Sequence, residues 1–249
     1  MESIGRYFIF LYSMFTNRER LKVRLQRTLD EFVSIGVESV PIIVVVSTFV
    51  GAVTCIQVYF NIYNPFVENF IVGYAVRNMT ILEMSPTIMA IIFAGRVGSS
   101  IAGQLGSMRI TEQIDALEIM GINTNSYLVM PKIIAAVLSY PLLVILSIFS
   151  SIFAGLLAAQ FVLDIPPEEY IRGLRYAFDP YIVRFALYKS MTFAFLVASI
   201  SSYRGFYTTG GAAEVGAAST QAVTESCIAI LLADYVLTQL LLQGPASTF

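Results

Sequence analysis

The chain has 249 residues, of which 57% are hydrophobic and only 13% are charged, and its formal net charge is −2. So much apolar surface exceeds what a soluble core of this size can bury, so the composition excludes an ordinary soluble protein and predicts an all-α integral membrane protein. The near-neutral charge argues against nucleic-acid binding, and two widely separated cysteines support neither a disulfide framework nor a zinc site.

The first 30 residues interleave apolar and basic side chains, with aromatic residues first and five cations between Arg18 and Arg27. This pattern is typical of an amphipathic helix in the membrane interface, with aromatics at the acyl boundary and cations at anionic headgroups. We therefore predict one interfacial helix over residues 1–30, with a solvated basic face as the alternative.

Apolar runs of about 20 residues or more, long enough to cross a bilayer, follow in the rest of the chain. The five predicted spans are about Val40–Ile62, Thr80–Leu105, Tyr127–Val162, Tyr181–Tyr203 and Gln221–Leu242. Residues 61–78 are predicted as a loop or re-entrant piece and residues 164–180 as a loop, while Pro141 predicts a kink in the third span. A Gly/Ala-rich stretch leads into the fifth span, and residues 1–249 are expected to form one membrane domain.

The distribution of Lys and Arg predicts the orientation of these spans. The cations before the first span place the N-terminus in the cytoplasm, and five spans then place the C-terminus outside. The loops around Arg109 and Arg204 become cytoplasmic. Three arginines in and just after the third-to-fourth loop run against this rule: Arg172, Arg175 and Arg184.

Small residues recur every four positions in the second half of the second span. One series is Ala94, Gly98, Ala102 and Gly106, and a second is Gly95, Ser99, Gly103 and Ser107. Such ridges let another helix approach closely, which is a strong packing device where lipid removes the hydrophobic drive between helices. Packing within one chain and packing against a second copy both remain open.

A short acidic helix is predicted between the second and third spans. Thr111 is placed to cap it, Glu112 lies in its first turn, and Gly121 suits a left-handed end. A cytoplasmic element of this kind is shaped to dock into a groove on a soluble partner, whereas an ordinary solvated loop helix is the alternative. The candidate docking residues are Arg109, Thr111, Glu112, Gln113, Asp115, Leu117, Glu118 and Met120.

Ionisable residues within the spans are costly unless paired, so Glu83, Lys189 and Asp234 are expected to have partners. We predict that Lys189 pairs with Asp234 or with Glu225, in a structural role rather than in proton transport. The chain has no histidine and no Gly-x-x-x-x-Gly-Lys-Ser/Thr loop, which excludes His-based catalysis and a nucleotide site of this type. An intramembrane enzyme and an ion-coupled transporter are the competing classes, and neither has a supporting motif.

Several segments together are similar to one family. They are Pro86, FAGRVGS at 93–99, Gly106-x-Met-Arg-x-Thr-Glu-Gln-x-Asp-Ala-Leu to residue 117, Gly211-Ala-x-x-Val-Gly-x-Ala-x-Thr-x-Ala-Val to residue 223, and Asp234-Tyr235. The sequence resembles the MlaE family, the permease subunits of ABC-type transporters that move phospholipid between the inner and outer membranes of Gram-negative bacteria. The resemblance covers nearly the whole chain.

The resemblance implies an inner-membrane permease with an interfacial helix, five spans and a coupling helix at about 111–120. Its implied partners are a second copy of the chain, a cytoplasmic ABC ATPase that holds ATP and Mg²⁺, a STAS-type regulatory subunit and a periplasmic MCE-type lipid-binding protein. No cofactor is expected in this chain itself. Phospholipid would bind between the two copies, near Ile56, Tyr59, Phe60, Ile81, Leu82, Glu83, Leu237, Leu240 and Leu241.

One position departs from the family pattern. Many members have an Arg-Glu pair where this sequence has Leu82-Glu83, which puts any role of that arginine in doubt here. Arg77 lies upstream on the same helix and is a candidate substitute.

Overall fold

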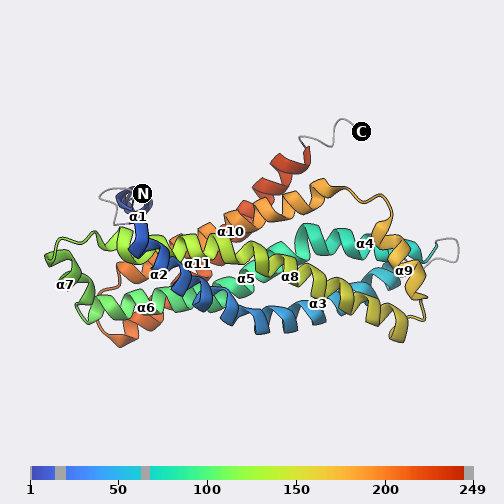
Figure 1. The fold of residues 1–249 in the computed structure, drawn as a ribbon, viewed down its shortest axis with the longest axis horizontal. Coiled ribbons are helices and arrows are strands. Elements are labelled where there is room, and N and C mark those ends of the chain that lie inside the picture. The colour runs from blue at the N-terminus through green and yellow to red at the C-terminus, as the bar shows by residue number, and fades with distance from the viewer. Residues whose placement is uncertain (1, 15–20, 63–67, 244–249) are drawn as a thin grey trace. The chain divides into compact units, whose positions relative to one another are not determined.

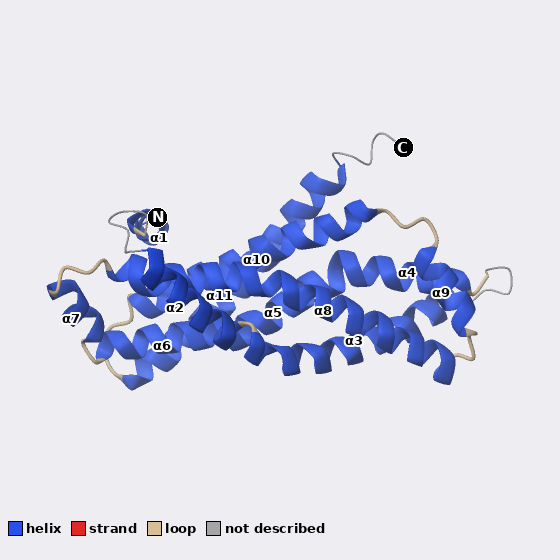
Figure 2. Ribbon diagram, in the orientation of Figure 1, coloured by secondary structure: helices blue, strands red, loops and turns tan. Residues whose placement is uncertain are grey.

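A computed structural model describes residues 2–14, 21–62 and 68–243, and this part of the chain contains helices but no strand (Figures 1 and 2). The α-helices are α1 Glu2–Ser13, α2 Leu21–Ile35, α3 Val40–Ile62, α4 Phe70–Met79, α5 Met89–Phe93, α6 Ser99–Ile110, α7 Gln113–Ile119, α8 Met130–Val162, α9 Pro167–Arg175, α10 Pro180–Phe206 and α11 Ala212–Gln243. A 3₁₀ turn η1 (Val37–Ser39) and three π-helical stretches, η2 (Thr80–Ile88), η3 (Ala94–Gly98) and η4 (Asn125–Val129), complete them.

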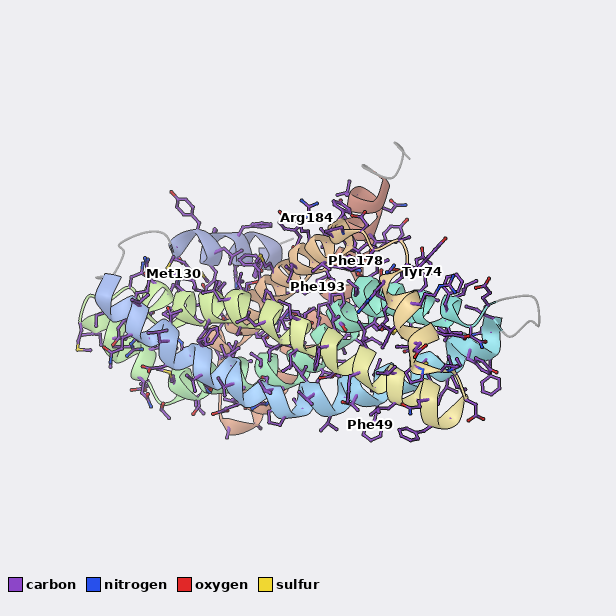
Figure 3. All side chains as sticks on the ribbon, turned by 45° about the vertical axis from the view of Figure 1, so that its right-hand side comes forward. Phe49, Tyr74, Met130, Phe178, Arg184 and Phe193 are labelled. Carbon is purple, nitrogen blue, oxygen red and sulfur yellow. The ribbon has the colours of Figure 1, made fainter. Side chains whose placement is uncertain are left out.

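Within the described residues, five helical stretches are long and apolar enough to cross a membrane: Arg24–Ile62, Phe70–Ile110, Asn125–Val162, Pro180–Phe206 and Ala212–Leu240. Large apolar side chains project from them, as Phe49 does from α3 with 69% of its surface exposed (Figure 3). Exposed side chains of this kind suit lipid as the surrounding solvent. The prediction of an all-α membrane protein with five spans is therefore confirmed.

Three predicted boundaries were wrong. The second span begins at Phe70, so α4 occupies the predicted loop, and the fifth begins at Ala212, so the Gly/Ala-rich stretch is itself helical. The predicted loop at 164–180 contains helix α9. Each of these segments is polar or rich in small residues, so its hydropathy is too low to predict a spanning helix. Packing against other helices stabilises them, and hydropathy does not detect such contacts.

The predicted single interfacial helix is two helices, α1 and α2, and Arg18 and Arg20 lie outside the described residues. Helix α1 buries Phe10 against three aromatic rings at the end of α10, Tyr203, Phe206 and Tyr207, with centroid distances of 5.6–5.8 Å. Beside them the hydroxyl of Tyr7 lies 2.7 Å from that of Ser199, and burial raises the pKa of Tyr7.

The described chain forms two compact units, one of residues 1–39, 90–140 and 191–249 and the other of residues 40–89 and 141–190. The boundaries between them fall at the start of α3 and inside α5, α8 and α10. The single permease domain over residues 1–249 therefore stays a prediction.

In the second unit, α4 and α9 lie side by side (Figure 1) and cross at two glycines. A Cβ atom at Gly73 would overlap the carbonyl oxygen of Tyr170, and one at Gly173 would overlap that of Phe70. Tyr170 is fully buried in the same cluster as Cys55 and Val76. Small residues at the crossing thus let two short helices pack at backbone distance.

Arg77 connects α4 to the end of α9 through hydrogen bonds. Its side chain is almost fully buried, and Nη1 donates to the carbonyl oxygens of Leu174 and Tyr176, each at 2.8 Å, where α9 ends. A guanidinium at a helix C-terminus satisfies carbonyl groups that lack helical partners. The suggestion that Arg77 substitutes for an arginine beside Glu83 was therefore wrong.

Candidate functional site

The turn between α6 and α7 sets the direction of the predicted coupling helix. The backbone of Glu112 has φ 59°, and α7 begins at the next residue. The Thr111 hydroxyl donates back to the carbonyl of Ser107 at 2.8 Å, so the prediction that Thr111 caps the helix was wrong. Gly121 has φ 77°, as predicted for a left-handed helix end.

An internal ion pair holds α7 against α6. Nη1 of Arg109 donates to Oδ1 of Asp115 at 2.5 Å, and the Arg109 guanidinium lies 5.9 Å from the ring centre of Phe206. Ile114 is fully buried beneath the helix. Asp115 and Arg109 are thus engaged with each other within the chain and help to position α7, and their predicted role in docking stays a prediction.

The opposite face of α7 is open. Ile119 is 87% exposed and Met120 66%, and Glu112 and Gln113 are exposed beside them. Leu117 is half-buried, and Glu118 accepts a hydrogen bond from Thr124 at 3.2 Å. Ile119, the most exposed apolar side chain of α7, was not among the docking candidates named from the sequence.

The first ridge of small residues packs inside the chain. Ala94 and Ala102 are fully buried, a Cβ atom at Gly98 would lie 2.8 Å from Oγ of Ser201, and one at Gly106 would lie 3.2 Å from Val215. The ridge therefore packs against α10 and α11 of the same chain, which was one of the two predicted alternatives.

The second ridge is more open. No atom lies within 4 Å of a Cβ built at Gly95, and Gly95 and Ser107 are exposed, while Ser99 is partly exposed. Gly103 alone meets a neighbour at ordinary contact distance, 3.5 Å from Oγ of Ser219. This ridge remains available for another molecule.

The two ridges give a direct test of close packing. Gly98→Leu is expected to lower the free energy of unfolding by about 1–3 kcal/mol or more, because the new side chain must displace Ser201 and Val197. Gly95→Leu is the matched control, since the same side chain enters open space there. Thermal unfolding of the purified protein in detergent measures both, and equal midpoints for the two variants would contradict the packing described.

An ion pair lies within the membrane-spanning helices of the second unit. Nζ of the fully buried Lys189 donates to Oε2 of Glu83 at 2.9 Å and to the carbonyl oxygen of Leu82 at 3.1 Å. Glu83 is 40% exposed and also accepts a 3.3 Å hydrogen bond from Thr87. Lys189 thus supplies the positive charge that Leu82 does not, on a helix 106 residues away in sequence.

The residues that flank Lys189 and Glu83 explain how the pair is held. Glu83 belongs to the π-helical stretch η2, which contains Pro86, and such stretches occur often at functional sites. The ring of Phe185 lies one helical turn before Lys189, with Nζ 5.4 Å from its centre. A buried cation with a carboxylate, a carbonyl and a ring around it is well compensated.

Comparison with known proteins agrees with these features. The model of the family described as "Permease MlaE" matches residues 28–240. The chain belongs to the MlaE permease family. A "Probable ABC transporter permease protein" of Rickettsia bellii is 34% identical over 239 residues, covering 96% of this chain and 92% of the relative.

Two further relatives extend the comparison. A "Probable ABC transporter permease protein" of Synechocystis is 34% identical over 227 residues, covering 91% of this chain and 86% of the relative. The protein "TRIGALACTOSYLDIACYLGLYCEROL 1, chloroplastic" of Arabidopsis thaliana is 32% identical over 223 residues, with 90% and 63% covered. This chain is therefore a transmembrane permease of an ABC transporter, and this class implies an ATPase partner.

The residues predicted to bind lipid differ in their burial, and their role stays a prediction. Ile56 and Tyr59 pack against the core of the second unit, Ile81 is 4% exposed, and Phe60 is 70% exposed. On α11, Leu237 is half-buried and Leu240 is exposed, and the side chain of Leu241 lies outside the described residues.

A pocket between α3, α4 and η2 lies near the predicted residues of the first two spans. Its volume is about 220 Å³, and its lining is Thr54, Gln57, Val58, Asn61, Ile62, Ala75, Met79 and Met84. The pocket thus combines polar side chains from α3 with the flexible thioether side chains of Met79 and Met84, a combination that suits an amphiphilic ligand. The sequence signals for this site were Gln57 and Asn61, the two amides within the first apolar run.

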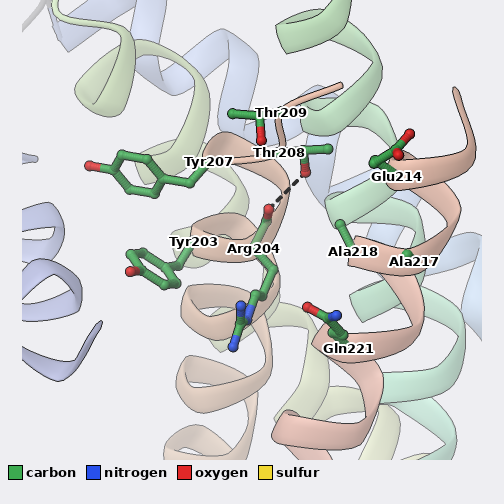
Figure 4. Close-up of a pocket in the computed structure, with 9 residues that line it drawn as sticks. All are labelled: Tyr203, Arg204, Tyr207, Thr208, Thr209, Glu214, Ala217, Ala218 and Gln221. Carbon is green, nitrogen blue, oxygen red and sulfur yellow. Dashed lines mark hydrogen bonds between the residues drawn. The ribbon is translucent and has the colours of Figure 1, made fainter. Parts of the chain in front are cut away.

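A second pocket, of about 240 Å³, opens between the end of α10 and the start of α11 (Figure 4). Its lining is Tyr203, Arg204, Tyr207, Thr208, Thr209, Glu214, Ala217, Ala218 and Gln221. Nε of Arg204 donates to Oε2 of Glu225 at 2.8 Å, and Nη2 contacts the other carboxylate oxygen. Glu225 is thus paired with Arg204, while the pairing of Lys189 with Asp234 stays a prediction.

Proposed function

We propose that this permease is the membrane subunit of an ATP-driven transporter that moves phospholipid between the inner and outer membranes of a Gram-negative bacterium. The observation that carries the proposal is the open face of α7 on a chain that matches the family over residues 28–240. A short helix between two spans, with Ile119 and Met120 exposed, supports docking of a cytoplasmic ATPase, where ATP and Mg²⁺ are bound.

Phospholipid as the substrate is supported by the amphiphilic pocket that contains Gln57 and Met84. The Arabidopsis relative is named after a glycolipid, trigalactosyldiacylglycerol, which agrees with a lipid substrate. The substrate site would lie between two copies of the chain. The exposure of α11 supports this location. Only 11% of its most apolar stretch is buried, against 33–50% in the other four spans, so its apolar surface is open to a second copy.

The proposed topology has the N-terminus and α7 in the cytoplasm and the C-terminus in the periplasm. A periplasmic MCE-type lipid-binding protein would then exchange lipid with the permease, and a STAS-type subunit would act on the cytoplasmic side. The cations of α2, among them Arg24 and Arg27, support a cytoplasmic N-terminus.

Reconstitution tests the proposal. The permease, co-expressed with a candidate ABC ATPase from the same organism, is expected to purify as a complex that retains phospholipid in native mass spectrometry. In proteoliposomes the complex should transfer fluorescent phospholipid to acceptor protein only when ATP is present and hydrolysable. Transfer that follows an ion gradient without ATP would overturn the proposal in favour of ion coupling, for which the Lys189–Glu83 pair would be the carrier.

A further inference from the structure

Arg96 has hydrogen-bonding capacity that its surroundings do not use. It lies in the π-helical stretch η3, and its only described ionic contact joins Nη2 to Oε2 of Glu38 at 3.4 Å, the long end of the hydrogen-bond range. Nη1 is buried and has no partner among the described residues. A buried guanidinium nitrogen without an acceptor is unfavourable, so an oxygen from another molecule is expected beside it.

A small groove surrounds this nitrogen. It lies between α2 with η1 on one side and η3 with α6 on the other, and its polar lining residues are Glu31, Ser34, Glu38, Arg96, Ser100 and Gln104. Its volume is about 40 Å³, more than the roughly 10–15 Å³ of cavity that one water needs. One or two oxygen atoms fit, whereas a whole lipid headgroup must remain at the mouth.

The polar wall of the groove is held in place by a buried lysine. Nζ of Lys132 donates to Oε1 of Glu31 at 2.5 Å and to Oε1 of Gln104 at 2.8 Å, and Lys132 is 5% exposed. Nε2 of Gln104 in turn donates to Oγ of Ser100 at 3.3 Å. Glu31 is thus neutralised by Lys132, which leaves Arg96 as the group with a free donor.

The groove lies where headgroups of one leaflet would be. Glu38 directly precedes the apolar run of α3, which begins at Val40, and the contact with Arg96 places both side chains at that level. The second span has 41 residues, or about 60 Å at 1.5 Å per residue, so it projects well beyond a bilayer of about 40–45 Å. Arginine at a bilayer interface meets phosphate groups, for which its planar fork is well suited.

We infer that this groove binds the phosphate group of a membrane phospholipid, with Arg96 as the principal donor. The occupant is zwitterionic, because Glu38 at the mouth is 62% exposed and attracts an ammonium group while it disfavours an additional negative charge. The inference depends on the proposed function only in naming phospholipid as the ligand. It assigns to the Arg of the Ala-Gly-Arg motif a binding role distinct from α7 and from the Lys189–Glu83 pair.

Lipid retention measured by native mass spectrometry tests the site. The full-length permease, delipidated and then re-equilibrated with phosphatidylethanolamine, is expected to retain one lipid per chain that Arg96→Gln loses, with occupancy about tenfold lower. Arg96→Lys should keep part of the occupancy, because the charge remains and the fork does not. Glu38→Gln should shift the preference toward phosphatidylglycerol, because the group that attracts the ammonium is lost. Arg184→Gln, which removes an exposed arginine outside the groove, is the matched control and should leave retention unchanged.

The remaining outcomes separate the possible occupants. Ser100→Met, which fills the groove and leaves Arg96 in place, should also lower occupancy, and it keeps the test valid if Arg96→Gln unfolds. Inorganic phosphate that displaces the lipid at millimolar concentration would overturn the lipid assignment in favour of a free anion. Unchanged retention in both Arg96→Gln and Ser100→Met would overturn the site. If the unaltered permease retains the lipid but shows no ATP-driven transfer, that result would contradict the proposed function alone.

Discussion

Met120→Asp is expected to abolish stable association with the ATPase while the permease remains folded in the membrane. Met120 and Ile119 are the large apolar side chains on the open face of α7, and exposed apolar side chains at the centre of an interface contribute most of its binding free energy. A carboxylate placed there must be desolvated on docking, which costs about 2 kcal/mol or more, or roughly a thirtyfold loss of affinity.

Co-purification of the ATPase with the tagged permease, together with ATP hydrolysis by the complex, measures this loss. Thr209→Asp is the matched control, because it adds the same carboxylate at an exposed position of the loop before α11. Glu112→Lys should weaken association by a smaller factor, since an exposed ion pair contributes little. If Met120→Asp retains the ATPase as well as Thr209→Asp does, α7 is not the docking element.

The internal pair of α7 changes how charge reversal there should be interpreted. Asp115→Lys would place two cations side by side, because Arg109 already lies 2.5 Å from the carboxylate. If Asp115→Lys loses the ATPase, the cause could be displacement of α7 itself. Glu112→Lys avoids this ambiguity, because it changes only the open face of the helix. The docking candidates predicted from the sequence thus include Glu112, which lies on the open face, and Asp115, which pairs with Arg109 within the chain.

The sequence was sufficient for elements whose stability comes from lipid. The apolar runs of α3, α8 and α10 predicted their helices to within a few residues, because hydropathy measures the transfer that inserts them. The start of α11 was missed for a different reason. Its first turns are Gly/Ala-rich and are fixed by packing, as at Gly106 against Val215, and such contacts have no local signature.

The candidate site shows the same division. The left-handed end of α7 at Gly121 was predictable, because the backbone conformation favours glycine there. That Glu83 is a partner of Lys189 was not, because Glu83 lies 106 residues away and the choice among several acidic residues depends on how the helices pack. Burial cost requires that such a cation have partners, but it does not select them.

Glu83→Gln is expected to destabilise the permease more than Lys189→Met does. The two members of the pair differ in exposure, since Lys189 is fully buried and Glu83 is 40% exposed. Removing the carboxylate leaves a buried cation with weaker compensation, and breaking a buried pair in this way costs about 3–5 kcal/mol. Removing the lysine leaves a carboxylate that can be solvated, so a smaller loss is expected.

Thermal unfolding of the single variants and of the double variant Glu83→Gln/Lys189→Met measures the coupling between the two residues. The double variant should recover most of the stability lost in Glu83→Gln, because neither charge remains to be compensated. Glu68→Gln is the control: it removes a carboxylate 3.7 Å from Arg172 in a largely exposed pair, where a change within about 0.5 kcal/mol is expected. Equal effects of Glu83→Gln and Glu68→Gln would contradict the burial argument.

Transport by the double variant then decides what the pair is for. If the pair only holds η2 against α10, ATP-driven lipid transfer should return together with stability, since a neutral pair of similar volume packs the same helices. If Lys189 and Glu83 instead exchange a proton or contact the lipid headgroup during transport, stability returns and transfer does not. The structural role predicts that the two properties recover together, and a stable double variant without transfer would show that the charges themselves take part in transport.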